Sequence, residues 1–321
     1  YRGSGVAVIG PAGENLVYIA NIMSEGRTAG RGGLGAVMGS KNLKAVVAKG
    51  RKKVNITHGE AYESFLKKVR RTVESHPITG KDGSMARFGT SVLIHRMTAA
   101  GMMPKDNFSK EHHLDYNDVD PFSGETVREK YLVGRRACFL CPTGCGRQIK
   151  VREETVKGPE YETTAMLGPN AGFYDFEGEI LPLSLLCDEL GLDTISAGNI
   201  LGFAKDIGLI SSRDDAEDFL EDLAYGRSAF SKGVKEASKD LGREAEAAHV
   251  KGLELPAYDP RGSKGISLAY ATSNRGGCHL RAYTIAPETL SNPGYLDPQE
   301  EKGMPQLIRK LQNVSAVYDS M

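Results

Sequence analysis

The stretch Leu181-Pro-Leu-Ser-Leu-Leu-Cys-Asp-Glu-Leu-Gly-Leu-Asp193 and the apolar run Thr194–Ile207 predict two helices joined by a tight turn. Pro182 is tolerated in the first turn of a helix, because the N–H groups there have no intrahelical partner. Gly191 suits the left-handed residue that ends a helix, and Asp193 can cap the start of the next one. This pair of helices predicts a mainly α body for the chain.

Further helical patterns lie on both sides of this pair. Thr57-His-Gly-Glu60 has the spacing of a capping box. The segments Ala216–Tyr225 and Ala229–Leu241 continue the helical series towards the C-terminus. After the capping box, apolar residues recur on one face while charged residues fill the other, which is typical of a surface helix. The apolar face consists of Tyr62, Phe65, Leu66, Val69 and Val73.

The N-terminal fifty residues carry strand patterns instead. Val6–Ile9 and Leu16–Ala20 are short apolar runs flanked by glycine and asparagine, and Leu43–Ala48 is rich in valine. Around Leu253–Ser263 the composition shifts to Pro, Gly and Asp, which indicates a domain boundary. We therefore expect a mainly α fold with a small N-terminal α/β remnant.

Composition excludes several classes of partner. The 321 residues hold 41 Lys and Arg against 41 Asp and Glu, so we expect no nucleic acid as partner. The longest apolar runs, such as Ser40–Gly50, are too short and too charged to cross a bilayer, and no signal peptide is visible. Five cysteines, three of them clustered, argue against a disulfide framework and favour the reducing cytoplasm.

The cluster Cys138-Phe-Leu-Cys141-Pro-Thr-Gly-Cys145 predicts a metal site. Three thiolates on one short loop repel one another, so a cation normally holds such a loop together, and Gly144 and Gly146 leave its backbone free to wrap. Iron–sulfur clusters and structural zinc both favour four cysteines, which implies a further ligand elsewhere. If that ligand is Cys187 or Cys278, the chain is a non-catalytic iron–sulfur or zinc-binding module.

A glycine-rich loop follows the first strands. Gly30-Arg-Gly-Gly-Leu-Gly35 satisfies G-x-G-x-x-G, but Asn21–Ala29 before it is polar and mixed, and no acidic residue lies about twenty positions later. A dinucleotide site is therefore disfavoured. Arg27, Arg31 and Lys41 favour a loop that binds an anion, and a simple glycine-rich turn is the alternative.

Three other motifs have both a structural and a functional interpretation. Asp188 and Asp193 serve a turn and a helix cap, or they accept paired N–H groups from an amino-pyrimidine edge. Gly158–Thr163 holds two acids beside a tyrosine, and such residues are usually solvated surface. His279 lies between glycines and arginines, where a hydrogen-bonded structural histidine is the default.

The order of these motifs resembles the tungsten-containing aldehyde ferredoxin oxidoreductase family. The family implies oxidation of an aldehyde to a carboxylic acid, at tungsten or molybdenum held by two pterins and next to a [4Fe–4S] cluster. A relative of the benzoyl-CoA reductase type, which acts reductively, is the alternative within the same family. The matching segments are Gly10–Asn15, Ala29–Lys44, Cys138–Cys145, Gly158–Thr163, Asp188–Asp193 and Gly277–Arg281.

The resemblance assigns the pterin ligands. Asp188, Leu192 and Asp193 match the family motif D-x-x-G-L-D, and Asp319 matches the first residue of a later D-x-x-G-L-C. The Gly-Leu-Cys of that second motif is absent, and its cysteine is the fourth ligand of the family's cluster. The resemblance thus implies an internal piece that lacks the N-terminal part and the C-terminal end, is inactive alone, and has an incomplete cofactor site.

The same resemblance assigns residues around the pterin phosphates. A bridging magnesium ion is implied there, with the carbonyl of Thr28 as one ligand. Pro182-Leu-Ser-Leu185 replaces an E-x-x-H that binds a metal between subunits in one family member, so no such metal is expected, and a homodimer stays open. The residues near the pterins are Arg27, Thr28, Gly30, Arg31 and Arg281.

For catalysis, the resemblance makes Glu162 the general base and His279 the donor of a hydrogen bond to the aldehyde oxygen. Ferredoxin, or another electron-transfer protein, receives the electrons through the cluster at Cys138, Cys141 and Cys145. The implied domains are the end of a pterin-binding β base domain at residues 1–52, a helical domain at 53–252, and a truncated second helical domain at 253–321.

Overall fold

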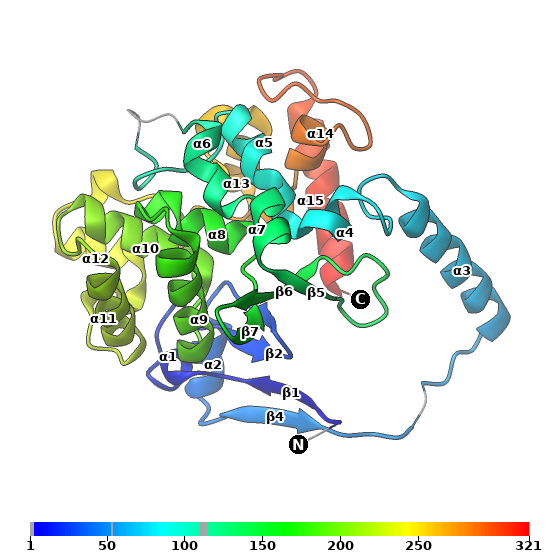
Figure 1. Cartoon of the computed structure of the whole chain (residues 1–321), viewed down its shortest axis with the longest axis horizontal. Helices are drawn as coiled ribbons and strands as arrows, with labels where there is room; N and C mark the ends of the chain where they lie inside the picture. The colour runs from blue at the N-terminus through cyan, green and yellow to red at the C-terminus, as the bar shows by residue number, and fades with distance from the viewer. Residues whose placement is uncertain (1–2, 53, 110–113, 321) are drawn as a thin grey trace.

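The computed structural model describes residues 3–52, 54–109 and 114–320 (Figure 1). About half of the described chain is helical, and three small sheets accompany the helices. The predicted fold class, mainly α with a small N-terminal sheet, is confirmed. In the described part of the chain, no helix is both long and apolar enough to traverse a bilayer.

The N-terminal sheet has the strand order β3-β2-β1-β4. Strands β1 and β4 pair antiparallel, with Val6 opposite Val47. They confirm two of the three predicted strands. The sheet and the two short helices beside it are β1 (Gly5–Val8), α1 (Pro11–Glu14), β2 (Ile22–Ser24), β3 (Arg27–Ala29), α2 (Leu34–Gly39) and β4 (Ala45–Ala48).

The predicted strand at Leu16–Ala20 is wrong. Leu16 adopts a left-handed conformation with φ of 59°, and the backbone N–H of Val17 bonds back to Ala12 in the preceding helix. Only Ala20 makes a bridge, to Leu192 beyond α9. The run is therefore a turn that buries Val17, Ile19 and Ala20 in the core and leaves Leu16 and Tyr18 exposed, and no neighbouring strand pairs with it.

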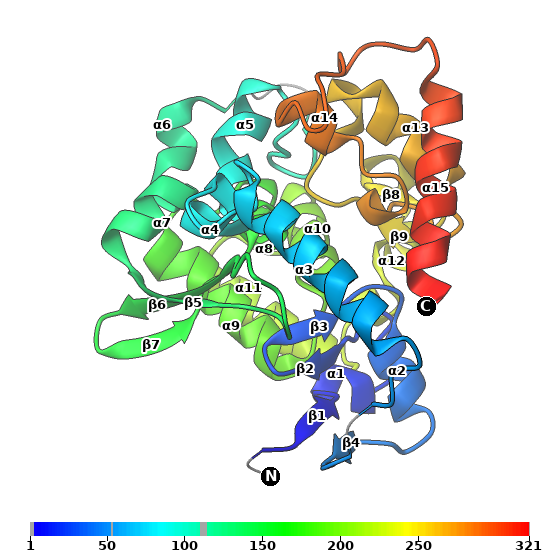
Figure 2. The ribbon, with the colours of Figure 1, turned by 90° about the vertical axis from the view of Figure 1, so that its right-hand side faces the viewer.

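The amphipathic helix after residue 57 is confirmed as α3 (Gly59–Ser75). The predicted capping box is wrong, because the N-cap is His58 and no side chain caps the helix. The apolar face of α3 is not buried: Phe65, for example, is 66% exposed. In Figure 1, α3 stands off the right-hand edge of the molecule, and in Figure 2 it crosses in front of it.

A second sheet and several short helices form the next part of the chain. Its strand order is β5-β6-β7, and all three strands are antiparallel. This sheet carries the cysteine cluster on the loop between β5 and β6, and the sequence patterns did not predict it. The elements are α4 (Ser84–Phe88), α5 (Leu93–Ala99), α6 (Tyr116–Val119), α7 (Gly124–Lys130), β5 (Leu132–Arg136), β6 (Gly146–Val151) and β7 (Glu154–Lys157).

The centre of the body is built from α8 (Tyr161–Leu167), α9 (Leu181–Leu190) and α10 (Thr194–Asp206). The predicted helix pair is confirmed. Gly191 ends α9 in the left-handed conformation, and the Asp193 carboxylate accepts the N–H of Ser196 at the start of α10. These helices contribute large apolar side chains to the main core, among them Met166, Leu183 and Phe203.

The C-terminal part adds further helices around this centre. The predicted helix Ala229–Leu241 is interrupted, because Gly233 with φ of 85° separates a 3-10 turn at Ala229–Lys232 from α12. The elements are α11 (Arg213–Ala224), α12 (Val234–Asp240), β8 (His249–Val250), β9 (Leu253–Glu254), α13 (Lys264–Thr272), α14 (Ile285–Thr289) and α15 (Met304–Ser320). The main core takes residues from all three predicted domains, whose boundaries stay predictions.

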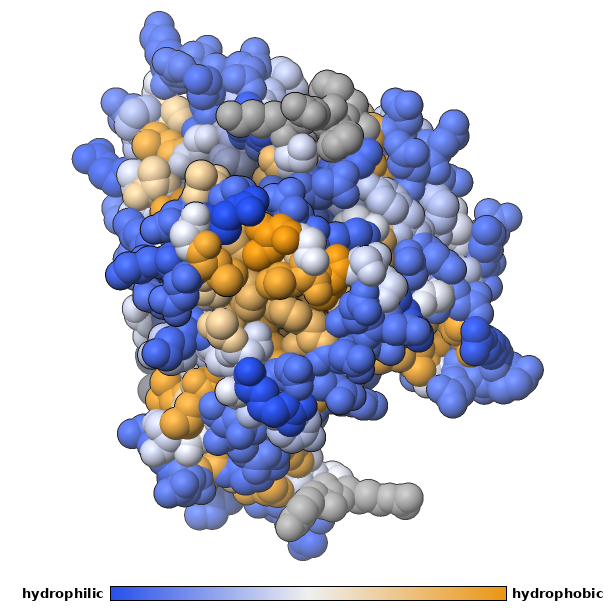
Figure 3. Space-filling model, turned by 90° about the vertical axis from the view of Figure 1, so that its left-hand side faces the viewer, coloured by the Kyte–Doolittle hydropathy of each residue, from blue (hydrophilic) through white to orange (hydrophobic). Residues whose placement is uncertain are grey.

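The surface on the side of α11 and α12 is mainly hydrophilic. Figure 3 shows this side, with one hydrophobic patch near its centre surrounded by hydrophilic residues. Nothing in the described part of the structure shows what covers this patch, so no role is assigned to it.

Replacing Gly198 by alanine should destabilise the protein. The closest packing of α10 on α8 lies at Gly198, where an added Cβ would stand 2.4 Å from the backbone carbon of Met166. Because backbone must move to make room, we expect a loss of about 3 kcal/mol. The matched control is Gly59→Ala at the first residue of α3, where a Cβ meets no atom within 4 Å. Thermal or urea unfolding of both variants tests this, and equal stability of the two would contradict the packing described.

Candidate active site and cysteine loop

A cavity of about 660 Å³ lies between the glycine-rich loop, the N-terminal ends of α8 and α10, and the segment before α14. Two smaller hollows of about 200 and 250 Å³ adjoin it, since all three are lined in part by Glu160. We call the cavity of about 660 Å³ the main cavity. It brings together predicted site residues from five distant segments: Thr28, Gly30 and Arg31; Glu162; Asp193; His279 and Arg281; and Asp319.

Glu162 and His279 face each other in the wall of the main cavity. One carboxylate oxygen of Glu162 accepts the N–H of Ala257 at 2.9 Å, and the other lies 3.4 Å from Nε2 of His279. Burial raises the pKa of Glu162 to about 7. Burial, together with the charges of Arg31 and Arg275, lowers the pKa of His279 to about 3. At neutral pH the pair is thus a half-protonated carboxyl beside a neutral imidazole, which suits proton transfer.

Aromatic rings surround this pair. The ring of Tyr258 lies 5.4 Å from the imidazole of His279 and that of Tyr283 lies 6.0 Å from it, centre to centre. The two phenol oxygens are 3.2 Å apart. Burial raises the pKa of both phenols, so both stay neutral and act as hydrogen-bonding groups. This wall of the main cavity therefore combines apolar surface with a few polar atoms, as in many small-molecule sites.

Four enclosed polar atoms of the main cavity's lining residues have no hydrogen-bond partner within the described residues. Oε1 of Glu162 and Nδ1 of His279 belong to the facing pair, and the other two are the Nε atoms of Arg275 and Arg281. Buried polar atoms are nearly always paired in folded proteins. Unpaired atoms on two neighbouring residues therefore indicate that a bound molecule completes their hydrogen bonding.

Arg31 is held by the protein itself. Its Nε lies 3.3 Å from the Asp193 carboxylate, and its other nitrogens donate to the backbone carbonyls of Gly277 and Glu254. The side chains of Arg31 and Asp193 are only 9% and 6% exposed. The structure thus brings these two predicted pterin-binding residues together, and it satisfies both charges without a ligand.

Asp188 and Leu192 lie beside the hollow of about 200 Å³. The Asp188 carboxylate pairs with Lys157 on β7 at 2.8 Å and is still partly exposed. Leu192 is buried, and its carbonyl accepts the side-chain N–H of Asn21. Thr28 and Arg27 line the same hollow from the opposite chain segment. Of the residues that match D-x-x-G-L-D, Asp188 therefore lies at the open edge of this hollow, and Asp193 is the buried cap of α10.

Arg281 and Asp319 form an ion pair across the main cavity's lining. Asp319 belongs to the last turn of α15, and Arg281 to a 3-10 turn near α14. Nε of Arg281 is buried and has no hydrogen-bond partner. Two residues that the resemblance assigned separately to the pterins are therefore in direct contact here.

The three clustered cysteines share the loop between β5 and β6, but they do not converge. Among residues 3–52, 54–109 and 114–320, no three His, Cys, Asp or Glu side chains are close enough to hold a metal ion. The backbone N–H of Thr143 lowers the pKa of the Cys141 thiol, against the effect of its partial burial. Burial raises the pKa of Cys145, and so does Glu160, although Arg27 opposes the shift. Amide donors to a thiol are the kind of contact that tunes an iron–sulfur cluster, so the donor set fits one.

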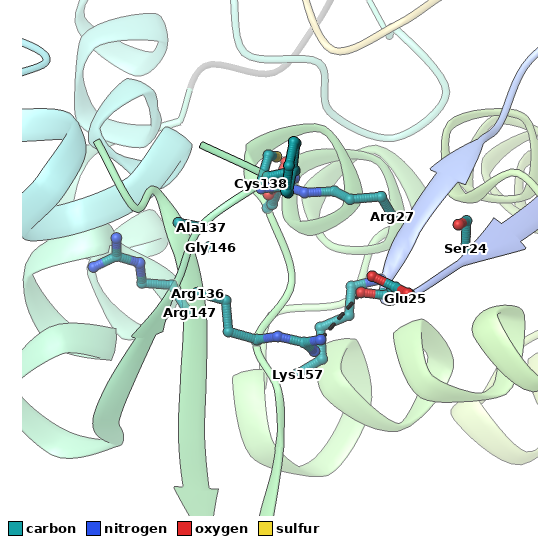
Figure 4. A pocket seen from close by; sticks show the side chains of 13 residues that line it. Ser24, Glu25, Arg27, Arg136, Ala137, Cys138, Gly146, Arg147 and Lys157 are labelled. Carbon is teal, nitrogen blue, oxygen red and sulfur yellow. Dashed lines mark hydrogen bonds and ion pairs between the residues drawn. The ribbon is translucent and has the colours of Figure 1, made fainter. Parts of the chain in front are cut away.

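Arg27 connects the cysteine loop to the cavities. It pairs with Glu160, and its Nη2 lies 3.9 Å from the sulfur of Cys145. Figure 4 shows its side chain extending towards Cys138 at the hollow of about 250 Å³. The predicted anion-binding arginine therefore lies between the thiols and the cavities.

Several lining residues escaped the sequence analysis. Lys157 directly precedes Gly158–Thr163, the acidic motif that we interpret as solvated surface, and this position was the available signal. Arg275 lies shortly before His279, and its guanidinium is 2.8 Å from the sulfur of Cys278. Tyr258 lies in the segment that we took for a domain boundary, where no pattern marks it as part of a site.

Comparisons with known proteins agree with this geometry. The family model for the N-terminal domain of aldehyde ferredoxin oxidoreductase matches residues 2–50, and the model for domains 2 and 3 matches residues 64–321. The tungsten-containing aldehyde ferredoxin oxidoreductases of Pyrococcus furiosus and Thermococcus kodakarensis are 40% and 38% identical to this chain, each over 98% of it and 55% of their own length. The chain thus spans about half the length of these curated relatives.

Two more distant relatives also match. The WOR-like subunit of an aliphatic sulfonate oxidoreductase from Pyrococcus furiosus is 33% identical over 84% of this chain and 47% of its own length. The solved active-site complex of a benzoyl coenzyme A reductase with 1,5-dienoyl-CoA has a TM-score of 0.67 and 22% identity. That match covers 85% of this chain and 46% of the solved one, and at this identity it shows a shared fold.

Removing the Arg31 guanidinium should destabilise the folded protein. In an Arg31→Gln variant, the buried Asp193 charge loses its partner, and we expect a loss of about 3–5 kcal/mol of folding free energy. A second change, Asp193→Asn, should recover part of this loss because the unpaired charge is then gone. Urea unfolding of the two single variants and the double variant measures the coupling.

The matched control for this cycle is Arg227→Gln, which breaks the exposed pair of Arg227 with Asp222. Exposed pairs contribute little to stability, so this variant should unfold almost as the wild type does. If Arg31→Gln is no more destabilising than the control, the buried pair does not hold the segments together.

Proposed function

Because this chain belongs to the aldehyde ferredoxin oxidoreductase family, we propose that it forms part of the catalytic centre of an enzyme that oxidises aldehydes to carboxylic acids. The observation that carries the proposal is the buried Glu162–His279 pair in the wall of the main cavity, with one unpaired polar atom on each residue. A tungsten-containing centre is proposed because relatives at 37–40% identity are named for it.

The residues present fit a large anionic cofactor. The three adjoining hollows run from the cysteine loop to the Glu162–His279 pair, and Arg27, Lys157 and Arg281 line them, each paired with a carboxylate of the chain. At Gly30 an added Cβ would stand 3.2 Å from the Asp193 carboxylate, so a larger residue there would crowd this wall. We propose that tungsten or molybdenum with two pterins binds along these hollows, with magnesium at the pterin phosphates. The residues that would hold this group are Arg27, Thr28, Gly30, Arg31, Asp188, Leu192, Asp193, Arg281 and Asp319.

When bound, the metal centre would accept the two electrons that the aldehyde loses. The chain's own part is proton transfer and orientation. Glu162, with a pKa of about 7, can take a proton from water at neutral pH and release it again. His279 is neutral at that pH, so it can donate an N–H to the aldehyde oxygen without adding a charge of its own. The rings of Tyr258 and Tyr283 restrict water around the pair.

Electron exit is proposed through the cysteine loop. Cys138, Cys141 and Cys145 would supply three ligands of a [4Fe–4S] cluster, which would pass electrons singly to ferredoxin or a similar carrier. A purely structural metal module is less well supported, because Cys187 is enclosed in the main core and Cys278 bonds to Arg275 at the main cavity. A reductive activity of the benzoyl-CoA reductase kind rests on shared fold alone. A cytoplasmic location and a homodimer are proposed from the family resemblance.

Replacing Glu162 by Gln in the full-length enzyme should lower the aldehyde oxidation rate about 10²–10⁴-fold, because a positioned base typically contributes this much. The rate of the wild type should rise with pH through about 7, as the Glu162 carboxyl loses its proton. A dye-linked assay with a simple aldehyde measures both. Metal analysis should find the same tungsten content in both proteins, and the exposed Glu129→Gln serves as control. Full activity of Glu162→Gln would refute the role of Glu162 as base.

A further inference from the structure

We propose that the tip of the cysteine loop and the arginines around it form the docking surface for an acidic electron-carrier protein. The inference rests on the proposed function, since it assumes that electrons leave through this loop. It assigns the residues that receive the carrier, which neither the family match nor the named relatives specify. We call Arg87, Arg128, Arg135 and Arg136 the arginine rim.

The tip of the loop is apolar and exposed. Phe139 is 92% exposed and Leu140 is 59% exposed, and both lie between the thiols of Cys138 and Cys141. Leu140 has φ of 57°, a conformation that a leucine seldom adopts and that turns the chain sharply at this point. Two large apolar side chains held in water are costly unless something covers them. They are suited to the apolar centre of a protein interface.

The arginine rim is joined to the loop by backbone contacts. Arg147 on β6 is buried, and it donates to the carbonyls of Gly144 in the loop and of Ala86 and Arg87 in α4. The guanidinium of Arg128 then donates to the carbonyl of Arg87. These bonds fix the ends of α4 and α7 next to the cysteines.

The other two rim residues end β5, directly before the loop. Arg135 pairs with Arg147 across the strands and donates to the carbonyls of Lys81 and Ala86. Arg136 reaches the backbone carbonyl of Glu25, as Figure 4 shows. The rim therefore has residues from α4, α7 and β5 around a single loop.

None of the four rim guanidiniums has a carboxylate within 4 Å in the described part of the chain. Arg87 and Arg128 instead stack on the ring of Phe88, at 4.8 and 5.8 Å. Some exposed arginines elsewhere pair with acids, as Arg227 does with Asp222, and others, such as Arg96, do not within the described residues. The chain has no formal net charge, so this local positive field is a property of the rim and not of the protein as a whole.

An exposed apolar tip inside an uncompensated positive rim fits a partner with acidic residues around a small apolar patch. Complementary charges steer such a partner and fix its orientation, while the apolar contact is small enough for rapid release. The position beside Cys138, Cys141 and Cys145 selects an electron carrier among acidic proteins, because contact at this tip shortens the path from the thiols to the partner.

The test uses the full-length enzyme with its cofactors, an acidic ferredoxin as electron acceptor, and benzyl viologen as a small acceptor that needs no docking. In an Arg128→Glu, Arg135→Glu double variant, KM for ferredoxin should rise about tenfold at low ionic strength, since steering by charge has at least this size. The rise should vanish at about 1 M salt, where charges are screened within a few ångströms. The benzyl viologen rate and the electron paramagnetic resonance signal of the cluster should stay unchanged.

Two further variants complete the test. Arg96→Glu is the matched control, because Arg96 on α5 is exposed, makes one bond to the carbonyl of Thr289 and has no carboxylate partner within the described residues. It should leave KM unchanged. Phe139→Ser should raise KM for ferredoxin without altering its salt dependence.

Three outcomes would overturn the docking inference. In the first, the double variant has an unchanged KM for ferredoxin. In the second, Arg96→Glu raises KM equally, which means that general charge is responsible. In the third, the benzyl viologen rate falls together with the ferredoxin rate, which means that the loop packs inside the enzyme. Wild-type enzyme that oxidises no aldehyde even with benzyl viologen would instead refute the proposed function.

Discussion

The guanidinium of Arg31 joins four segments that are far apart in the sequence. It contacts the cap of α10 at Asp193 and the carbonyls of Glu254 and Gly277, while its own backbone belongs to the glycine-rich loop. Each buried N–H that it donates would otherwise lack a partner. The segment of Gly277 continues directly into His279, so the distance between this histidine and Glu162 depends on the same guanidinium. The geometry of the candidate site is thus set by an internal ion pair.

Local chemistry made part of the fold predictable. Gly191 and Asp193 act through their own backbone and nearest neighbours, so the turn between α9 and α10 follows from the sequence. The strand prediction for Leu16–Ala20 failed because a buried turn and a strand can give the same apolar run. Only contacts with distant residues, such as that of Ala20 with Leu192, distinguish the two. The sheet around the cysteine loop was not predicted for the same reason, because its strand pairing depends on residues that no short sequence pattern connects.

In the candidate site too, the sequence indicated individual residues but not the contacts between distant segments. Motif resemblance selected Glu162 and His279, and the structure places them 3.4 Å apart although 117 positions separate them. Resemblance did not indicate that Arg31 is held by Asp193 or that Arg281 meets Asp319, because an ion pair depends on where two chain segments cross. Tyr258 gave no signal at all, and Lys157 gave only its position beside the acidic motif. Their roles come from the hollows that they line.

The exposed apolar face of α3 has a consequence for the energetics of this region. The helix has 17 residues and buries none of them, so the core contributes nothing to its stability. A helix of that length without tertiary support is only marginally stable in water. Its amide protons should therefore exchange with solvent through local helix–coil opening, while those of α10 exchange only when the whole body unfolds. Helix α3 therefore unfolds as a separate cooperative unit, and a destabilising substitution in the core should leave its helical content unchanged.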